Sequence, residues 1–364
     1  MRPPHTAKRG VNTFQLADAS CGLSQSRFVT TSPHTTVAEI GEQAIIERIT
    51  RRLEMPAWVE VGPGDDAAVV KPARGLREVL TTDALVDGVH FDQAFVPADA
   101  IGHRALAVNL SDLAAMGAQP RAVLLSLALP GTLRVAVLDG LIDGFLGQAG
   151  VHHATLVGGN ITQTPGPLVI NVTAIGTVRP RRALERSGAR PGDEIYVTGA
   201  VGDAATGLAM LRAAAAGPAA ESACVLRYLR PEPRVRAGLQ LAHHGAASSC
   251  VDLSDGLADG LRQLARASGV GVEIDAGALP VSDQARAWHA AAGTDWLAAA
   301  LGGGDDYELL FTVRPRHRGR LRGARRRIGD LPITRIGVVA RGDALLLRDA
   351  SGCRGLPVGF EHFR

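Results

Sequence analysis

Apolar positions become regularly spaced from Val37 onward, and their spacing predicts alternating helices and strands. A helical period runs through Ile45, Ile46 and Ile49, and a long helix follows Pro97. Short β-branched and aliphatic runs predict strands at residues 79–82, 123–129, 155–157 and 168–178. This alternation is typical of an α/β (α+β) layer structure in which helices pack on mixed sheets.

The second half also alternates predicted strands and helices, and a segment with the composition of a linker precedes it. Residues 179–192 carry two prolines and five arginines, and a strand at 194–198 follows them. An alanine-rich helix then follows Gly202, and another spans about 256–268, where Gly269 stops it. We therefore expect three parts, namely a disordered extension, an N-terminal α/β domain and a C-terminal α/β domain. Their predicted bounds are residues 1–36, 37–180 and 190–364.

The predicted extension is rich in Ser, Thr, Arg and His, contains only Asp18 as an acid, and has no apolar period. We interpret it as an upstream-extended start or a loose tail rather than a transit peptide. No apolar run in the chain approaches the ~20 residues needed to span a membrane. The sequence thus predicts a soluble protein without membrane partners.

Composition narrows the possible chemistry. Hydrophobic residues make up 46% and aromatic residues 4%, so the core must be aliphatic. The net charge is only +3, which argues against nucleic acid as a partner. Lys8 and Lys71 are the only lysines among 39 basic residues, and Lys71 lies between Val70 and Pro72. A Walker-type phosphate loop and a protein-kinase lysine are both excluded.

Two further features are expected to be structural. The cysteines form no Cys-x-x-Cys pair, so we expect four core residues in a reducing compartment rather than a zinc site or disulfides. They are Cys21, Cys224, Cys250 and Cys353. Residues 314–327 hold eight arginines without interleaved aromatics, and this pattern favours a solvated face over a nucleic-acid surface.

Acidic residues gather beside glycines and at predicted strand ends. Five clusters occur, at residues 64–66, 81–83, 111–112, 252–256 and 303–306. Any one of them could be a turn or a helix cap, because Asp and Ser satisfy backbone N–H groups. Five together favour a Mg²⁺ centre, since carboxylate and hydroxyl oxygens are hard ligands and substrate phosphates usually complete such sites.

Asp112 can be placed by helical geometry. In a helix over 98–117, Ile101, Ala105, Val108 and Asp112 fall on one stripe, which puts a carboxylate on the core-facing side. Burial of an unpaired carboxylate is very costly, so the group must be paired or bound to a metal. We favour a metal; the alternative is an ion pair with a distant arginine.

The cluster at 252–256 precedes a predicted helix, and we expect Ser254 or Asp255 to be its N-cap. A helix start also attracts phosphate, so the same turn fits a Mg²⁺-nucleotide. Many carboxylates, scarce lysine and no nucleophile–base pair together indicate phosphoryl transfer, where positioning and charge neutralisation dominate catalysis. If the acceptor were itself a phosphate, it would already be ionised and would need no general base.

Five motifs, in order, closely resemble the thiamine-monophosphate kinase family. They are GDDAAV at 64–69, TTDALVDGVHF at 81–91, AVNLSDLAAMG at 107–117, VDLSDGL at 251–257 and GGDDYELLF at 303–311. The resemblance runs from about residue 38 to Phe363. It implies an ATP-dependent kinase that phosphorylates thiamine monophosphate to the diphosphate with several Mg²⁺ ions. It also implies a two-domain fold shared with aminoimidazole ribonucleotide synthetase, in which the N-terminal domain binds ATP and Mg²⁺ and the C-terminal domain completes the active site. A cytoplasmic location and a homodimer are implied as well.

The resemblance also implies residue roles, none catalytic beyond the metal ligands. The implied Mg²⁺ ligands are Asp66, Thr81, Thr82, Asp83, Asp112, Asp252 and Asp255. The implied ATP contacts are Gly159, Asn160, Arg186 and Ser254. The implied thiamine-phosphate contacts are His90, Asp305 and Phe360.

Three of these residues depart from the family pattern. Asn160 stands where many members have Asp, Asp305 where Glu is common, and Phe360 where Tyr or Trp is more usual. The departures at Asn160 and Asp305 keep open the alternative of a non-enzymatic nucleotide or thiamine-phosphate binder. A related ATP-using synthetase of the same fold is a second alternative, which the motifs do not favour.

Overall fold

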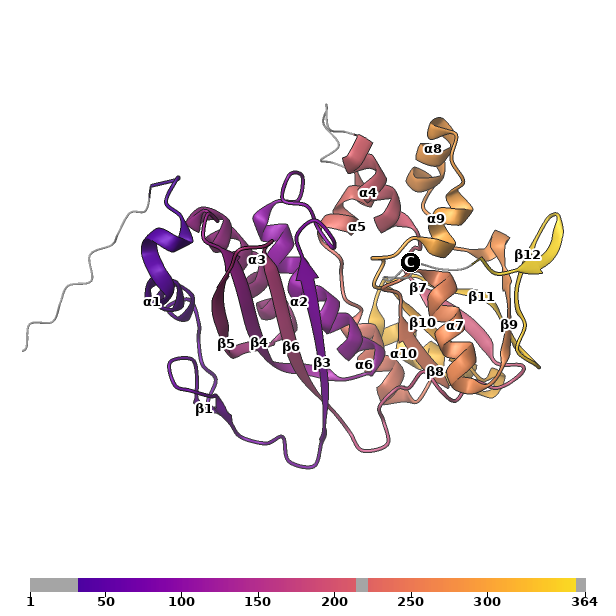
Figure 1. Cartoon of the computed structure of the whole chain (residues 1–364). Helices are drawn as coiled ribbons and strands as arrows, with labels where there is room; N and C mark the ends of the chain where they lie inside the picture. Colours follow the sequence, from indigo (N-terminus) through magenta and orange to yellow (C-terminus); the bar gives the residue numbers. More distant parts are fainter. Residues whose placement is uncertain (1–31, 214–221, 358–364) are drawn as a thin grey trace, which may run out of the picture. The chain divides into compact units, whose positions relative to one another are not determined.

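The computed structural model describes residues 32–213 and 222–357, and two large sheets organise them. The first has four strands in the order β3 (Arg77–Val86), β6 (Val169–Val178), β4 (Gln119–Pro130) and β5 (Thr155–Thr164). Only the β4–β5 pair is parallel. Helices α2 (Ala98–Ala115) and α3 (Val135–His152) pack on one face of this sheet (Figure 1).

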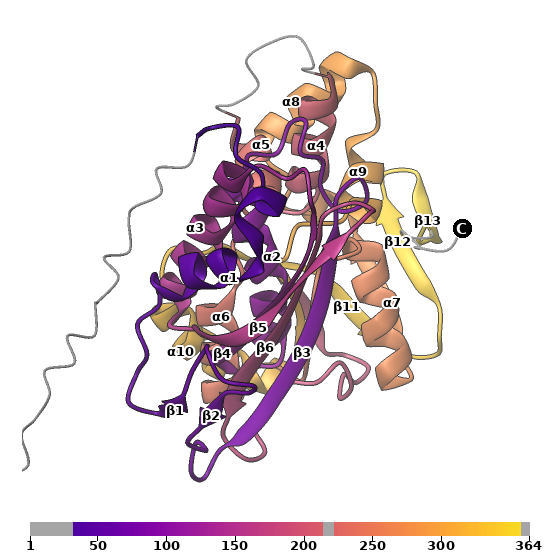
Figure 2. The same ribbon diagram turned by 60° about the vertical axis from the view of Figure 1, so that its left-hand side comes forward.

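The second sheet has seven strands in the order β13, β12, β9, β11, β7, β10 and β8. Their bounds are β7 (Glu194–Thr198), β8 (Ser249–Asp252), β9 (Gly271–Asp275), β10 (Leu309–Val313), β11 (Ile333–Ala340), β12 (Leu345–Asp349) and β13 (Gly352–Gly355). The helices of this half are α4 (Asp203–Ala213), α5 (Ala223–Leu229), α6 (Val235–His244), α7 (Leu257–Ser268), α8 (Asp283–Ala292), α9 (Trp296–Gly302) and α10 (Arg318–Ile328). The predicted mixed α/β layer architecture is confirmed (Figure 2).

Before the first sheet, α1 (Val37–Thr50) is followed by the small hairpin of β1 (Val59–Val61) and β2 (Val69–Val70). Two 3-10 turns, Ala276–Ala278 and Pro315–His317, complete the described elements. The Thr36 backbone N–H donates to the Glu39 carboxylate at 2.6 Å, closing a capping box that starts α1. Gly269 ends α7 at φ +64°, which confirms its predicted role as helix stop.

Three strands are longer than the hydrophobic pattern predicts. The run at 79–82 becomes the ten-residue β3, the run at 123–129 the twelve-residue β4, and the run at 155–157 the ten-residue β5. Apart from Ile161, the added residues of β5 are polar or glycine, so hydrophobicity alone does not mark them. They are strand because β5 pairs with β4 out to Thr164.

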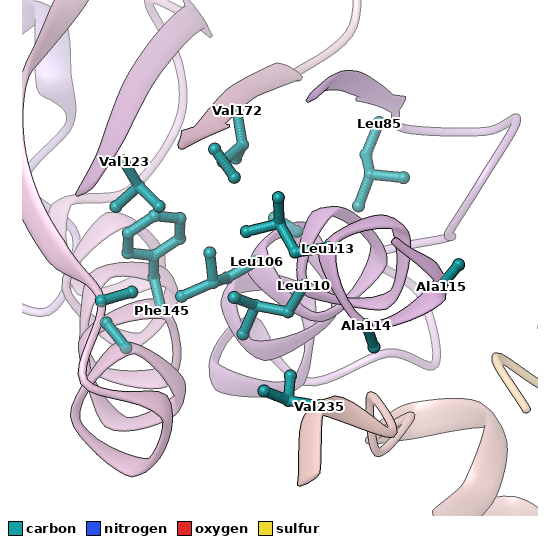
Figure 3. Close-up of a cluster of buried hydrophobic side chains, with 14 of the residues drawn as sticks. Leu85, Leu106, Leu110, Leu113, Ala114, Ala115, Val123, Phe145, Val172 and Val235 are labelled. Carbon is teal, nitrogen blue, oxygen red and sulfur yellow. The ribbon is translucent and has the colours of Figure 1, made fainter. Parts of the chain in front are cut away.

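The core is aliphatic, as the composition predicts, and residues of both halves share it. Leu106, Leu110 and Leu113 of α2 lie between the first sheet and α6, where Val235 contacts the same cluster (Figure 3). Residues from Pro33 onward fall in one compact unit. The segment 179–192 separates the two large sheets along the chain, and the division into two domains stays a prediction.

The structure also bears on the predictions made for the cysteines, the arginine-rich segment and membrane-spanning helices. Cys224 and Cys250 are buried as expected, but Cys353 is exposed on β13, so its assignment to the core is wrong; Cys21 lies outside the described residues. The arginines of α10 are exposed, which agrees with a solvated face. Within residues 32–213 and 222–357, no helix is both long and apolar enough to span a bilayer.

Candidate active site

A cavity of about 480 Å³ is lined by residues of β3, α2, α4, α5 and β8 and of the segments that follow β3, β8 and α9. Six aspartates line it: Asp83, Asp92, Asp112, Asp252, Asp255 and Asp305. Arg212 is the one arginine or lysine along its described lining, and His90 also lines it. We call this space the acidic cavity. A larger hollow of about 640 Å³ elsewhere contains none of the predicted site residues.

Strand alternation in β3 decides which of Thr81, Thr82 and Asp83 face α2. Thr81 and Asp83 share the face toward α2, and the Thr81 hydroxyl donates to the Asp112 carboxylate. Thr82 lies on the opposite face, where its hydroxyl donates to the Val172 carbonyl at 3.1 Å. Burial, with the nearby charge of Asp112 and a hydrogen bond to it, raises the pKa of Asp83 to about 6.

Asp112 occupies the position on α2 that the stripe predicts. Ile101 and Ala105 are buried, and Val108 and Asp112 continue the stripe into the cavity wall. The ion pairs of the described residues do not include Asp112, so the alternative of a distant arginine finds no support there. Its neighbours are the Thr81 hydroxyl and other carboxylates.

Asp252 is the most buried of these acids, at 7% exposure, and it accepts a hydrogen bond from Ser111 at 2.7 Å. Burial and the charge of Asp112 raise its pKa to about 7, while the Ser111 bond and the charge of Arg186 oppose that rise. A cation beside Asp252 would oppose this rise, because it favours the ionised carboxylate.

The prediction that Ser254 or Asp255 caps α7 is wrong. Gly256 is the N-cap, at φ +93°, and no side chain caps the helix. A Cβ on Gly256 would lie 2.7 Å from the Gly303 carbonyl oxygen, so only glycine fits this close approach. Ser254 instead donates to Asp255 at 3.1 Å, and both residues line the acidic cavity.

The acidic cavity suits a hard divalent cation by its donor chemistry. Carboxylate and hydroxyl oxygens face it, and burial together with the charge of Asp112 raises the pKa values of Asp83 and Asp252, so a bound cation would stabilise both carboxylates. Among the described residues, however, no three His, Cys, Asp or Glu side chains are arranged to hold one ion by themselves. This fits Mg²⁺, which keeps several waters and is commonly held by one or two carboxylates together with substrate phosphates.

His90 and Asp305 lie on the same cavity. His90 Nδ1 accepts a hydrogen bond from the Val86 backbone N–H at 3.1 Å, so a neutral ring carries its proton on Nε2. Asp305 has a left-handed backbone at φ +69° and accepts a hydrogen bond from the Tyr307 hydroxyl at 3.0 Å. The two predicted substrate residues therefore share one site.

The neighbouring acids of the last motif serve the fold. Asp306 accepts hydrogen bonds from the backbone N–H groups of Gly202 at 2.7 Å and Ala204 at 3.2 Å, which caps the start of α4. Glu308 is buried against Arg234. Of the three acidic residues in this motif, only Asp305 faces the acidic cavity.

Several predicted residues lie off the cavity lining. Asp66 is exposed in the turn before β2, where its N–H donates to Asp65 at 2.9 Å. Gly159 and Asn160 are exposed on β5, and a Cβ on Gly159 would lie 1.9 Å from the Leu125 carbonyl oxygen. Arg186 is exposed yet close enough to lower the pKa of Asp252 by its charge. Phe360 lies outside the described residues.

Sequence reasoning missed four residues that the fold brings to this site. Asp92, Arg212, Tyr228 and Tyr307 line the acidic cavity. Arg212 and Tyr228 come from α4 and α5, far along the chain from the acidic motifs, and no spacing rule connects them. Tyr307 belongs to the motif at 303–311. Its backbone φ of +50° is not that of a strand, so strand alternation does not predict where its side chain points.

Known proteins resemble this chain over most of its length. Family models for the N-terminal and C-terminal domains of AIR synthase related proteins match residues 64–178 and 190–348. The thiamine-monophosphate kinase of Salmonella typhimurium is 40% identical over 333 residues, which cover 89% of this chain and 98% of that protein.

Two solved structures are also similar. A thiamine-monophosphate kinase crystal structure from Stenotrophomonas maltophilia gives a TM-score of 0.75 at 40% identity, covering 83% of this chain and 95% of that one. The structure of AaThiL complexed with AMPPCP and TMP gives 0.71 at 32% identity, covering 91% of this chain and 100% of that one.

Proposed function

Because the chain belongs to the thiamine-monophosphate kinase family, a family of enzymes, we propose that it uses ATP to phosphorylate thiamine monophosphate to thiamine diphosphate. The acidic cavity carries this proposal, since it holds Asp83, Asp112 and Asp252 on the same lining as His90 and Asp305. The relative complexed with AMPPCP and TMP supports both substrates.

The chain contributes binding, orientation and charge control to this reaction. The acceptor is a phosphate that is already ionised near neutral pH, so no residue has to remove a proton from it. His90 and Asp305 would orient the thiamine end of the acceptor within the acidic cavity. Direct in-line transfer then depends on holding the two phosphate groups together.

Several Mg²⁺ ions would shield the phosphate charges from one another and from the aspartates when bound. Asp83, Asp112, Asp252 and Asp255 are the proposed ligands on the cavity lining, with Thr81 beside Asp112. Asp66 and Thr82 remain proposed ligands that lie away from this lining.

The nucleotide would contact Ser254 on the cavity lining and Arg186 close to Asp252. Gly159 and Asn160 on β5 complete the proposed ATP contacts, and Phe360 the proposed substrate contacts. Asn160 brings a carbonyl oxygen but no charge, which weakens any metal contact at that position.

We also propose a cytoplasmic homodimer. Support for self-association comes from the face of the first sheet that points away from α2, where Leu80 is 64% exposed and Leu124 is 37% exposed. Exposed apolar side chains on one face are typical of a contact surface. Light scattering should give twice the chain mass; a monomer at micromolar concentration would contradict the dimer.

A coupled assay for thiamine diphosphate formation tests the function directly. Purified protein, ATP, Mg²⁺ and thiamine monophosphate should yield thiamine diphosphate and ADP in equal amounts. Formylglycinamidine and selenide substrates should give no turnover, which separates the related synthetases of this fold. Binding of thiamine monophosphate without product would instead indicate a binding protein.

A further inference from the structure

Arg104 on α2 is one of the largest fully buried side chains of the described residues, at 1% exposure. Its guanidinium contacts three separate segments. One end donates to the Tyr228 carbonyl, and the other lies 3.1 Å from the Asp305 carboxylate and 3.5 Å from the His90 carbonyl oxygen. The guanidinium also lies over the Tyr228 ring, 4.5 Å from its centroid.

A buried arginine costs desolvation energy, which stability alone rarely justifies. Replacement of buried ion pairs by apolar residues is often neutral or stabilising. Arg104 bears a further cost, because its Nε has no hydrogen-bond partner among the described atoms. The groups it does contact are therefore the informative ones.

Those groups are the cavity residues themselves. Asp305, Tyr228 and His90 all line the acidic cavity, and each contacts Arg104. The contacts of Arg104 and Tyr307 with Asp305 both use Oδ1, so Oδ2 takes part in neither. One guanidinium thus fixes the Asp305 carboxylate and the backbone at His90 relative to each other.

We propose that Arg104 is a positioning residue for the thiamine moiety of the acceptor, acting through Asp305 and the backbone of His90; this rests on the proposed function. Thiamine monophosphate carries a thiazolium cation and an amino group, and a carboxylate attracts both. Arg104 holds that carboxylate in one place before the substrate arrives. Its effect is therefore on the thiamine substrate and not on ATP.

The test compares Arg104→Met and Arg104→Lys with wild type, measuring kcat and the KM of each substrate. Arg104→Met should raise KM for thiamine monophosphate by about tenfold or more, the loss of one charge-assisted contact, while KM for ATP changes less than about twofold. Arg104→Lys keeps the cation and should recover part of the loss. Arg230→Met is the matched control, because Arg230 pairs with Asp99 outside the cavity lining.

Equal rises in both KM values, or a fall in stability with both KM values unchanged, would overturn the proposal. If Arg104→Met does not fold, the double variant Arg104→Lys with Asp305→Asn replaces it. Non-additive effects of the two changes on KM for thiamine monophosphate are expected, and additive effects overturn the link to Asp305.

If wild type forms no thiamine diphosphate, the proposed function fails first. Calorimetric binding of thiamine monophosphate then tests Arg104 separately, with weaker binding to Arg104→Met expected and equal binding overturning its role.

Discussion

Glu308, just before β10, and Asp252, at the end of β8, are both buried carboxylates, but within the described part of the chain only Glu308 forms an ion pair. Glu308 is 1% exposed and is held by Arg234 through two hydrogen bonds of 2.7 and 2.5 Å, with Thr198 donating at 2.6 Å. Asp252 has the Ser111 hydroxyl at 2.7 Å, and its nearest charged influences include another carboxylate, Asp112.

The difference shows where the chain supplies its own positive charge and where it does not. At Glu308 the fold places an arginine against a carboxylate that no ligand needs to reach. At the acidic cavity Asp112 accepts from the Thr81 hydroxyl and Asp252 from the Ser111 hydroxyl. Burial, together with the charge of Asp112, raises the pKa values of Asp83 and Asp252. Uncompensated carboxylates on a cavity wall are the arrangement expected where a cation and phosphates bind.

The strongest test of this comparison removes one cavity carboxylate. Asp83→Ala should reduce turnover by on the order of 10³-fold, because a proposed metal ligand for the phosphates is lost. The variant should still fold, since the raised pKa of Asp83 shows that its charge is not stabilised in the free protein. Steady-state kinetics and circular dichroism measure the two effects.

Glu78→Ala is the control for this variant. Glu78 is an exposed acid on the same strand and outside the acidic cavity, so its removal should leave turnover within about twofold of wild type. Near-normal turnover of Asp83→Ala would contradict the assignment of the metal cluster.

Glu308→Gln removes the ion pair between Glu308 and Arg234 and should lower the stability of the fold. Loss of the carboxylate leaves the buried Arg234 with the exposed Glu232, at 2.7 Å, as its one acidic partner among the described residues. We expect the free energy of unfolding to fall by about 3 kcal/mol, typical of an unpaired buried charge. Urea denaturation measures it, and unchanged stability with lost turnover would instead place Glu308 in the reaction.

Much of the fold could be predicted from the sequence, because apolar periodicity and glycine stops act locally. The strand at 194–198 and the end of α7 at Gly269 are where the pattern places them. The length of β5 could not be predicted, since its polar residues are strand only through pairing with β4. A local sequence pattern carries no information about which distant strand will pair with it.

The candidate site divides in the same way. The helical stripe places Asp112 correctly on the cavity wall. The motifs at 81–91 and 251–257 single out Asp83 and Asp252, which line the same cavity. The opposite faces of Thr81 and Thr82 follow from strand alternation once β3 is known to extend over both. Arg104 and Tyr228 could not be found, because the packing of α2 against α5 and the turn after α9 brings them together.

The smallest expected effect is also the most specific, and it concerns Asp252→Asn in metal-free protein. The amide still accepts the Ser111 hydrogen bond but carries no charge, so at pH 8 in EDTA the variant should be more stable than wild type by about 1–2 kcal/mol. Urea denaturation at several pH values measures the difference. Asp139→Asn is the control, because Asp139 has its own arginines, Arg48 and Arg52, and its loss should destabilise.

The pH dependence of this difference follows from the pKa of Asp252, which is about 7 in the folded protein and about 3.9 in an unfolded chain. Between these values the folded wild type binds a proton that the unfolded chain does not, so lower pH stabilises it relative to its state at pH 8. The advantage of Asp252→Asn should therefore shrink as pH falls from 7 toward 4. Excess Mg²⁺ at pH 8 should reduce it too, because only the wild-type carboxylate gains from the cation. An advantage independent of both pH and Mg²⁺ would mean that Asp252, like Glu308, is already compensated within the chain.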